Sequence, residues 1–457
     1  METKQAFSLN TEHRTLNTEH PMAWLLYNIL FSVGFLLLLP HFLLRMRRRG
    51  GYTRHFWQRI GRYEPDVAAR LAGGGRIWIQ AVSVGEMNLA LGFLEQIRRR
   101  RPGTKFVVST TTSTAHEIAE KKLPADDVLI YFPADFPFIA RRALKAIRPA
   151  ALILVENELW PNLVRLARAR GVPVVLINGR ISEHSYRGYR KLRVFTRRLL
   201  PMVDRFCVQS PGDGQRLWDL GAPEDRITVI GSGKYDIAEP DPSDAEKARA
   251  VLRAAGITEK HAVLLGGSTW PGEEAILLDL YKELKAERED LALVLVPRHV
   301  ERRAAVLAEI EARGLTVLRR SEIGPGAAPA ERPDVLLVDT TGELMGFYSC
   351  ATIIFVGKSL SGQQGGQNII EPAWWGKPVL VGPNMKNFAA VMEEFLGANA
   401  ILQVPDAHGL KMAALGLLDD PVRRVELGAR AARLVREKAG VGERTLDRIG
   451  PVIFPAG

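Results

Sequence analysis

Cysteine is scarce in this 457-residue chain, which has only Cys207 and Cys350. Both lie in apolar runs, which favours buried free thiols over a disulfide or a metal site. A protein body without disulfides is typical of a reducing compartment. No second His or Cys follows His299 at metal-ligand spacing, so this histidine is expected to form structural hydrogen bonds. The sequence therefore predicts no bound metal and no other cofactor.

Signatures of RNA or DNA binding are also lacking, so nucleic acid is not an expected partner. Lys and Arg number 62 against 51 Asp and Glu, which gives a net charge of +11. This excess favours anionic partners such as phosphates, nucleotides and acidic lipid. It does not indicate a fold.

The first 21 residues are polar and have nothing from which to build a core. We expect a disordered tail at 1–21, or a true start at Met22 instead of Met1. Residues 22–44 are almost wholly apolar and long enough to cross a bilayer, and four arginines follow at once. A signal peptide has the reverse order of charge and apolar run. We predict a membrane-anchor helix at 22–44 with the rest of the protein at the cytoplasmic face, and a buried helix is the alternative.

After the anchor, short apolar runs alternate with longer amphipathic segments, a pattern that indicates βα units around a parallel sheet. The pattern restarts after a polar break near 239–245. At this length we expect two doubly wound domains, 45–238 and 239–457, with a cleft between them. The segment 421–438 has helical periodicity and is expected to pack back across the first domain.

Ligands of open α/β sheets bind beyond the carboxyl ends of the strands, so polar residues that follow apolar runs are the candidates for a site. In the first domain Glu86 follows one such run, and it serves either as a catalytic group or as a helix cap. Glu156 and Glu158 follow another run beside an aromatic residue. Arg180 follows a third and suits an anionic substrate. Lys234 falls at the domain junction, where it is either a residue of the site or simply a solvated lysine.

In the second domain a glycine-rich loop between Val356 and Pro372 joins an apolar run to a helical segment. Such a nest of backbone N–H groups at a helix N-terminus binds phosphate, although glycines also serve turns that bind nothing. Glu371 comes three residues after Asn368, so it either closes a capping box or reaches a ribose hydroxyl. Arg298 is the best candidate for a bidentate contact with a nucleotide phosphate.

Eight motifs follow one another along the chain: Ala-Val-Ser-Val-Gly-Glu (81–86), Glu-Asn-Glu-Leu-Trp-Pro-Asn (156–162), Asn-Gly-Arg-Ile-Ser (178–182), Gly-Ser-Gly-Lys-Tyr-Asp (231–236), Ser-Thr-Trp-Pro-Gly-Glu-Glu (268–274), Pro-Arg-His (297–299), Gly-Glu-Leu (342–344) and Gly-Gly-Gln-Asn-Ile-Ile-Glu-Pro (365–372). In this order they resemble the motifs of the Kdo (3-deoxy-D-manno-octulosonic acid) transferases of lipopolysaccharide synthesis. The resemblance runs from the anchor to about Pro383 and departs from the family at Gln80 and Gln367, where His is usual, and at Ser232, where Asn is frequent.

The resemblance implies a GT-B fold and an enzyme at the cytoplasmic face of the cell inner membrane. It also implies an inverting, metal-independent transfer of Kdo from CMP-Kdo to a lipid A precursor. It implies that Glu86 is the base and that Glu156 and Lys234 stabilise the charged transition state. The implied CMP contacts are Pro297, Arg298, Gly342, Glu343, Leu344, Asn368, Ile369, Ile370 and Glu371. The implied substrate contacts are Ser83, Gly85, Glu158, Arg180 and Ser268.

Two other functions stay open at this point. A nucleotide-sugar epimerase would share the two domains and the nest but would need neither anchor nor lipid acceptor. A non-catalytic, membrane-bound anion-binding protein would explain the charge and the anchor, but not the acids at so many strand ends.

Overall fold

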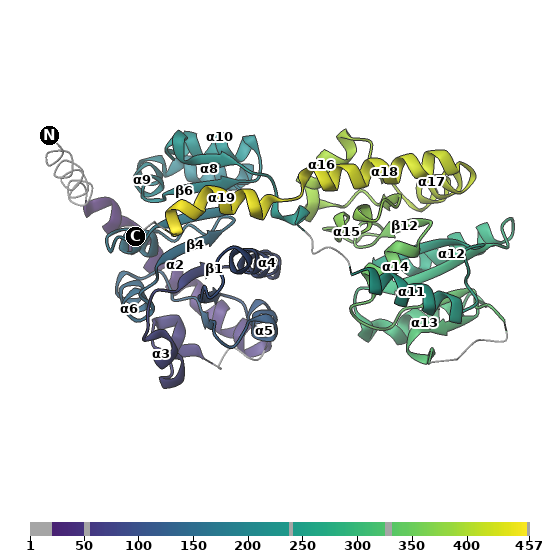
Figure 1. Cartoon of the computed structure of the whole chain (residues 1–457), viewed down its shortest axis with the longest axis horizontal. Helices are drawn as coiled ribbons and strands as arrows, with labels where there is room; N and C mark the ends of the chain where they lie inside the picture. The colour runs from purple at the N-terminus through teal and green to yellow at the C-terminus, as the bar shows by residue number, and fades with distance from the viewer. Residues whose placement is uncertain (1–20, 50–54, 237–240, 325–330, 455–457) are drawn as a thin grey trace. The chain divides into compact units, whose positions relative to one another are not determined.

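The computed structural model describes residues 21–49, 55–236, 241–324 and 331–454 (Figure 1). The predicted tail therefore lies outside the described residues, apart from Pro21. Two compact units make up the chain, one of residues 1–233 with 440–457 and the other of residues 234–439. Each is a parallel sheet with helices on both faces, as the alternation of apolar runs and amphipathic segments predicts.

The first unit has a seven-stranded parallel sheet in the order β3-β2-β1-β4-β5-β6-β7. Its inner strands are buried on both faces, which is why they read as continuous apolar runs. The strands are β1 (Ile77–Gln80), β2 (Phe106–Thr110), β3 (Val128–Tyr131), β4 (Ala151–Val155), β5 (Val174–Gly179), β6 (Arg205–Val208) and β7 (Ile227–Val229).

Helices cover both faces of this sheet, and several begin where the sequence supplies a Ser or Thr cap or a proline in the first turn. They are η1 (Phe56–Ile60), α3 (Pro65–Leu71), α4 (Val84–Arg100), α5 (Ser113–Lys122), α6 (Pro137–Ile147), α7 (Pro161–Arg168), α8 (Glu183–Lys191), α9 (Arg193–Leu199), η2 (Leu200–Met202), α10 (Pro211–Leu220), η3 (Glu224–Arg226) and, at the junction with the second unit, η4 (Gly233–Tyr235).

The second unit repeats this plan with the order β10-β11-β9-β8-β12-β13-β14, again all parallel. Its strands are β8 (Ala262–Thr269), β9 (Leu291–Pro297), β10 (Val317–Arg319), β11 (Val335–Leu337), β12 (Ile353–Val356), β13 (Val379–Val381) and β14 (Leu402–Gln403). Its helices are α11 (Pro242–Ala254), α12 (Glu273–Lys285), η5 (Val300–Arg302), α13 (Arg303–Glu311), η6 (Arg320–Glu322), α14 (Leu344–Cys350), α15 (Ile370–Trp374), η7 (Lys386–Phe388), α16 (Ala389–Gly397), α17 (Ala407–Asp419) and α18 (Pro421–Lys438).

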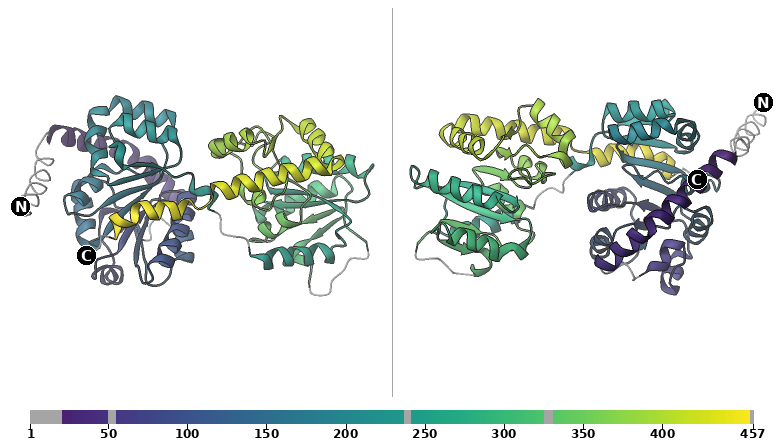
Figure 2. Two further views of the ribbon diagram at one scale, coloured as in Figure 1. Left: turned by 45° about the horizontal axis from the view of Figure 1, so that its top comes forward. Right: turned by 180° about the vertical axis from the view of Figure 1, so that it is seen from behind.

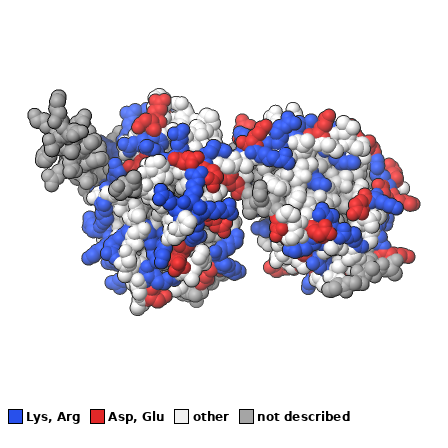
Figure 3. All heavy atoms as spheres, viewed as in Figure 1, with Lys and Arg blue, Asp and Glu red and all other residues white. Residues whose placement is uncertain are grey.

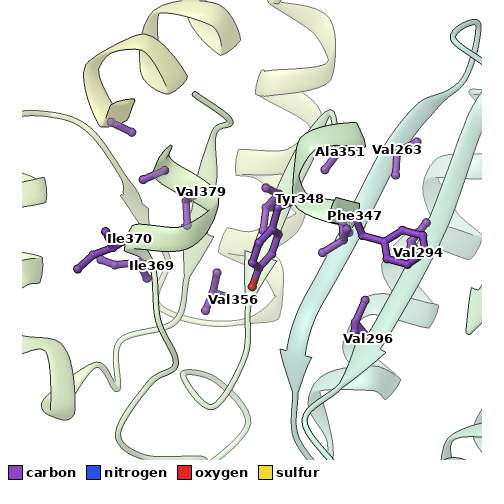
Figure 4. Packing of buried hydrophobic residues seen from close by; sticks show 14 of the residues in the cluster. Val263, Val294, Val296, Phe347, Tyr348, Ala351, Val356, Ile369, Ile370 and Val379 are labelled. Carbon is purple, nitrogen blue, oxygen red and sulfur yellow. The ribbon is translucent and has the colours of Figure 1, made fainter. Parts of the chain in front are cut away.

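Aromatic side chains of α14 fill the core on one face of the second sheet. Figure 4 shows Phe347 directed toward Val294 and Tyr348 extending toward Val356. The Tyr348 hydroxyl lies so close to the end of β8 that a Cβ at Gly267 would be 2.6 Å from it. Gly267 is therefore required there by close packing.

The chain does return to the first unit, but through a later segment than expected. Helix α18 belongs to the second unit, and α19 (Val441–Ile453) packs in the first. Leu446, Ile449 and Ile453 join the apolar cluster that covers one face of the first sheet. The prediction that 421–438 packs across the first domain is wrong, and residues 440–457 group with the first unit rather than the second.

Helix α2 (Pro21–Arg49) lies along the first unit (Figure 2, right). One face packs on this unit, because Trp24 and Tyr27 contact the Phe195 ring at 5.2 and 5.3 Å between centroids. Phe31 and Phe35 contact the ring of Phe136 at 5.0 and 5.2 Å.

Two polar side chains of the packed face of α2 form hydrogen bonds with the first unit. The Tyr27 hydroxyl donates to Oδ2 of the buried Asp135 at 2.9 Å. Asn28 Oδ1 accepts from Nδ2 of the buried Asn162 at 2.8 Å. Asn162 lies in the first turn of α7, directly after the loop that carries Glu156 and Glu158.

The other face of α2 is exposed and apolar, and includes Leu25, Leu26, Ile29, Leu30, Val33, Leu36, Leu37 and Leu38. Residues 22–40 have a mean hydropathy of 2.1, so by length and composition this helix is able to cross a membrane. Helix α2 is nevertheless not a buried helix, which was the alternative to an anchor. It also contacts the first unit, which an isolated anchor would not do.

Candidate active site

The first candidate site lies at the carboxyl edge of the first sheet. Between β1 and β4 the strand order reverses direction, and a doubly wound sheet opens a crevice at such a point. Glu86 lies in the loop-to-helix segment that follows β1, and Glu156 and Glu158 lie in the loop that follows β4. The topology thus brings the predicted acids to the one edge position where a ligand is expected.

Glu86 is buried, and both of its carboxylate oxygens are held. The Val82 N–H donates to Oε2 and the Ser83 hydroxyl donates to Oε1, each at 2.8 Å. Ser83 Oγ in turn accepts from the Glu86 N–H at 3.2 Å, which completes a reciprocal cap at the start of α4. The capping role of Glu86 is therefore observed, and it fixes the carboxylate in one orientation. A catalytic role needs this oriented carboxylate to reach a substrate hydroxyl.

Glu158 lies close enough to Glu86 for their charges to interact. The pKa of Glu158 is raised to about 7, chiefly by burial and also by the negative charges of Glu86 and Glu156, and a hydrogen bond from Trp160 opposes this rise. That bond runs from the indole N–H to Oε2 at 2.8 Å. Near neutral pH this edge of the sheet therefore holds Glu158, which exchanges its proton readily, and the Glu86 carboxylate, which is fixed by two donors. Two acids with such different surroundings are able to serve one as general acid and the other as general base.

Glu156 and Asn178 adopt left-handed backbone conformations, with φ of 58° and 51°. Asn178 Nδ2 donates to Glu156 Oε1 at 3.3 Å, and Asn178 Oδ1 accepts from the Gly233 N–H at 2.9 Å. Strained residues of this kind concentrate at functional sites. Asn178 belongs to the Asn-Gly-Arg-Ile-Ser motif, but no local pattern in the sequence identifies it as the residue that links the ends of β4 and β5 to Gly233.

The other predicted residues of the first unit differ in their surroundings. Gly85 is exposed, and the half-buried Arg180 makes no hydrogen bond or ion pair with the part of the chain that the structure describes. Gln80 is fully buried at the end of β1, where it accepts a hydrogen bond from the Ser109 hydroxyl, and its Nε2 has no partner among the described atoms. Gln80 therefore lies within the sheet instead of at its surface.

The corresponding position in the second sheet lies between β8 and β12. Here the glycine-rich loop after β12 differs from expectation in its first part. The buried carboxylate of Glu273 accepts from the N–H groups of Lys358, Ser359 and Leu360 at 2.8–2.9 Å, and from that of Trp270 at 2.9 Å. These three loop amides are therefore occupied by the protein itself and do not form an open phosphate nest.

Glu273 belongs to the Ser-Thr-Trp-Pro-Gly-Glu-Glu motif, but nothing in the local sequence predicts this role. Its carboxylate lies only 2.7 Å from where a Cβ at Gly357 would be, so only glycine fits there. Burial raises the pKa of Glu273, and the four backbone donors oppose that rise.

The end of the same loop supplies the remaining candidates. Asn368 Oδ1 accepts from the Ile370 N–H at 3.0 Å, and its Nδ2 donates to Glu371 Oε1 at 3.0 Å. Glu371 therefore bonds the Asn368 side chain, not the cap backbone. Burial raises the pKa of Glu371, whereas the hydrogen bond from Asn368 and the charge of Arg298 lower it. The guanidinium of Arg298 is exposed at the end of β9, and it forms no hydrogen bond or ion pair with the described residues.

Several other predicted CMP contacts are already engaged within the second unit. Ile369 and Ile370 are fully buried in the core, so only their backbone is available to a ligand. Glu343 forms an ion pair with Arg320 at 3.0 Å, and Leu344 packs against the core. Gly342 has a φ of 88° and Ser268 one of 52°, while Pro297 ends β9.

Lys234 begins the second unit, directly after Gly233. Its ammonium donates to the backbone oxygen of Asn387 at 3.0 Å and lies 4.8 Å from the ring centroid of Phe388. Lys234 is thus half-buried and contacts the second unit, and its role in a site stays a prediction. Within the described ranges no group of three His, Cys, Asp or Glu side chains is placed to hold a metal ion. The metal-free reaction stays a prediction.

Comparison with known proteins decides the family. A family model described as 3-deoxy-D-manno-octulosonic-acid transferase (kdotransferase) matches residues 54–237. The chain is 36% identical over 414 residues to the 3-deoxy-D-manno-octulosonic acid transferase of Bordetella pertussis, covering 89% of this chain and 94% of that protein. The chain belongs to the Kdo transferase family. A Kdo transferase is a glycosyltransferase, so the chain is an enzyme of that class.

Solved structures support the GT-B fold of this Kdo transferase. A glycosyltransferase from Rickettsia africae ESF-5 matches with a TM-score of 0.54 at 13% identity, covering 84% of this chain and all of that one. A putative UDP-N-acetylglucosamine 2-epimerase from Listeria monocytogenes also has a TM-score of 0.54, at 14% identity, covering 84% and 98%. At these identities the likeness concerns the fold alone. The fold therefore does not separate transferase from epimerase, but the sequence relatives do.

Proposed function

We propose that this Kdo transferase moves Kdo from CMP-Kdo to a lipid A precursor, with inversion at the anomeric carbon and without a metal. The observation that carries the proposal is family membership together with two acids at the β1/β4 crevice. In the reaction the acceptor hydroxyl attacks the anomeric carbon, the bond to the CMP phosphate breaks, and the hydroxyl proton must leave. A base and a charge-stabilising site for the departing phosphate are the two requirements.

Glu86 is the proposed base. Its carboxylate is fixed by Val82 and Ser83, which is the preorganisation that a base requires. Glu158, whose pKa is raised to about 7 mainly by burial and whose charge interacts with that of Glu86, is proposed to receive or share that proton. Glu156 and Lys234 are proposed to stabilise the charged transition state, and Ser83, Gly85, Arg180 and Ser268 to contact the substrates.

The proposed CMP site lies at the β8/β12 edge of the second unit. The free guanidinium of Arg298 suits a phosphate, and Glu371 suits a ribose hydroxyl. The amides of residues 358–360 are taken by Glu273, and those of Gln363, Gly365, Gly366 and Ile370 also donate within the protein, so the proposed phosphate donors are the other amides of residues 361–369. The other proposed contacts are Pro297, Gly342, Glu343, Leu344, Asn368, and the backbone of Ile369 and Ile370.

We also propose that α2 holds the enzyme at the cytoplasmic face of the inner membrane by lying in the membrane surface. Its outer face is apolar, and its inner face is bonded to the first unit, so lipid is excluded from that side. Figure 3 views the first unit from the side opposite to α2, so the Lys and Arg that are prominent there are not part of the proposed membrane contact.

The test is to incubate the purified protein with CMP-Kdo and a tetra-acyl lipid A precursor and to weigh the lipid product. A mass increase by one or more Kdo residues, with release of CMP, is the expected result. An epimerase would change the nucleotide sugar without any acceptor, and an anion-binding protein would convert nothing. NMR of the new anomeric centre then tests the inversion.

A further inference from the structure

A cavity of about 370 Å³ opens at the edge of the second sheet opposite to the proposed CMP site. It lies at the amino ends of β8, β12 and β13, where His261, Thr352 and Pro378 precede those strands. Its volume falls within the range of small-molecule sites, about 300–1,000 Å³. The function proposed above makes no use of it.

The cavity collects positive charge. Arg249 and Arg253 line it from one face of α11, and Lys377 and Arg424 line it from the segment before β13 and from α18. Glu259 is the acid among its described lining residues, and Glu246 pairs with Arg249 and Arg253 at the rim, so the four cations still outnumber the acids. Such a wall favours an anion with two or more charges.

The two half-buried cations in the cavity lack acid partners. Lys377 has no hydrogen bond or ion pair in the described part of the chain, and Arg424 bonds only the backbone oxygens of Leu417 and Leu418 there. The pKa of Lys377 is lowered, chiefly by burial and also by the nearby charge of Arg424, whereas the interaction with Cys350 opposes this shift. Like charges that converge in a partly desolvated place are costly unless an anion joins them.

The rim cations are held in a different way. Glu246 accepts from Arg249 Nε at 3.0 Å and from Arg253 Nη2 at 2.8 Å, which fixes both arginines on one side of α11. Each guanidinium keeps further N–H groups for a ligand. The cavity therefore combines four cations. They are the ammonium of Lys377, which has no partner among the described residues, the partly hydrogen-bonded guanidinium of Arg424, and the two oriented arginines Arg249 and Arg253.

We propose that this cavity binds a phosphate-bearing ligand, with Lys377 and Arg424 as its inner contacts. A phosphate or diphosphate group carries the two or more negative charges that the wall requires and accepts bidentate bonds from arginine. The group belongs either to a soluble phosphate ester or to a phospholipid headgroup.

Calorimetric titration of the full-length, detergent-solubilised protein with inorganic pyrophosphate tests the proposal. The titration is made with CMP present at saturation, so that the proposed CMP site is already filled. Lys377→Met is expected to weaken pyrophosphate binding by about 10–100-fold, the effect of losing one charge-assisted contact. Lys411→Met is the matched control, because Lys411 is similarly half-exposed on α17 but pairs with Glu283. It should leave the affinity within about twofold.

Melting temperatures separate a ligand site from a merely strained lysine. With a ligand site, pyrophosphate raises the melting temperature of the wild type and the Lys411→Met variant but not that of Lys377→Met. No pyrophosphate binding by the CMP-saturated wild type, or equal binding by all three proteins, would overturn the proposal. So would a Lys377→Met variant that simply melts higher while pyrophosphate has no effect on either protein.

The source of the phosphate is decided by competition. Vesicles of phosphatidylcholine with phosphatidic acid displace pyrophosphate from the wild type if the ligand is a headgroup, whereas phosphatidylcholine vesicles do not. If neither displaces it, a soluble phosphate ester is the ligand. Both results support the site.

Discussion

The docking of α2 on the first unit makes a prediction that differs from that of a simple anchor. If α2 were only a membrane anchor, deleting residues 1–49 would release a folded, soluble enzyme. In the structure the deletion removes the Tyr27 donor from the buried Asp135 and the Asn28 acceptor from the buried Asn162. It also uncovers the rings of Phe136 and Phe195. We therefore expect the truncated protein to be destabilised and prone to aggregate.

Single substitutions measure this without deletion. Tyr27→Phe keeps the ring packed on Phe195 but removes a hydrogen bond to the Asp135 carboxylate, a loss of about 1.5–3 kcal/mol. Asn28→Ala removes a neutral hydrogen bond to Asn162, a loss of about 0.5–1.5 kcal/mol. The Asp135 carboxylate also accepts from the N–H groups of Asn162 and Leu163 at 2.9 and 2.8 Å, so the perturbation reaches the start of α7.

The assay is chemical denaturation of the detergent-solubilised full-length variants, with turnover measured on the same preparations. Leu37→Ala is the control, since Leu37 is 75% exposed on the outer face of α2. It should leave the free energy of unfolding within about 0.5 kcal/mol and weaken only binding to vesicles. The reasoning is refuted if Tyr27→Phe unfolds like the wild type, or if the 1–49 deletion yields a soluble protein of unchanged stability.

Four further predictions concern the candidate site of the first unit and the proposed CMP site of the second. Glu86→Gln should lower turnover by about 10²–10⁴-fold with CMP affinity unchanged, measured by product mass and calorimetry; near-normal turnover with a lower melting temperature would leave Glu86 only its cap. Arg298→Ala should weaken CMP binding by about 1.5–3 kcal/mol, and unchanged calorimetric affinity would remove it from the site. Glu273→Gln should cost about 1–3 kcal/mol of stability in denaturant titrations, because an amide supplies fewer acceptors for four N–H groups; an unchanged midpoint would contradict that role. The pKa of Glu158 in the folded protein, about 7, exceeds its value in the unfolded chain, so the stability that this group contributes is lost as the pH rises through 7. Glu158→Gln should therefore stabilise the protein relative to the wild type more at pH 8 than at pH 5. An equal change in the free energy of unfolding at both pH values would contradict the raised pKa.

The apolar runs that indicate a parallel sheet coincide with mostly buried strands, whereas three strands at sheet edges have no such run. Strands β7, β10 and β14 have two or three residues each and are half-exposed or exposed, so they carry no apolar run. The crossing by α19 was missed for a related reason, because amphipathic periodicity shows that a helix has an apolar face but not which sheet that face meets.

The glycine-rich loop shows why a site is harder to predict than a strand. Its sequence fits a phosphate nest, and a nest is a set of converging N–H groups whose occupant the local pattern does not specify. The occupant of the Lys358–Leu360 amides is a carboxylate 85–87 residues away in the chain, and it is seen only when β8 and β12 are side by side. The same carboxylate holds the Trp270 N–H and so joins the two loops that border the β8/β12 crevice. The Glu273 carboxylate thus holds the first part of the loop, and the proposed phosphate contact moves to the later residues, where Asn368 and Glu371 are hydrogen-bonded to each other and Arg298 has no hydrogen bond or ion pair with the described residues.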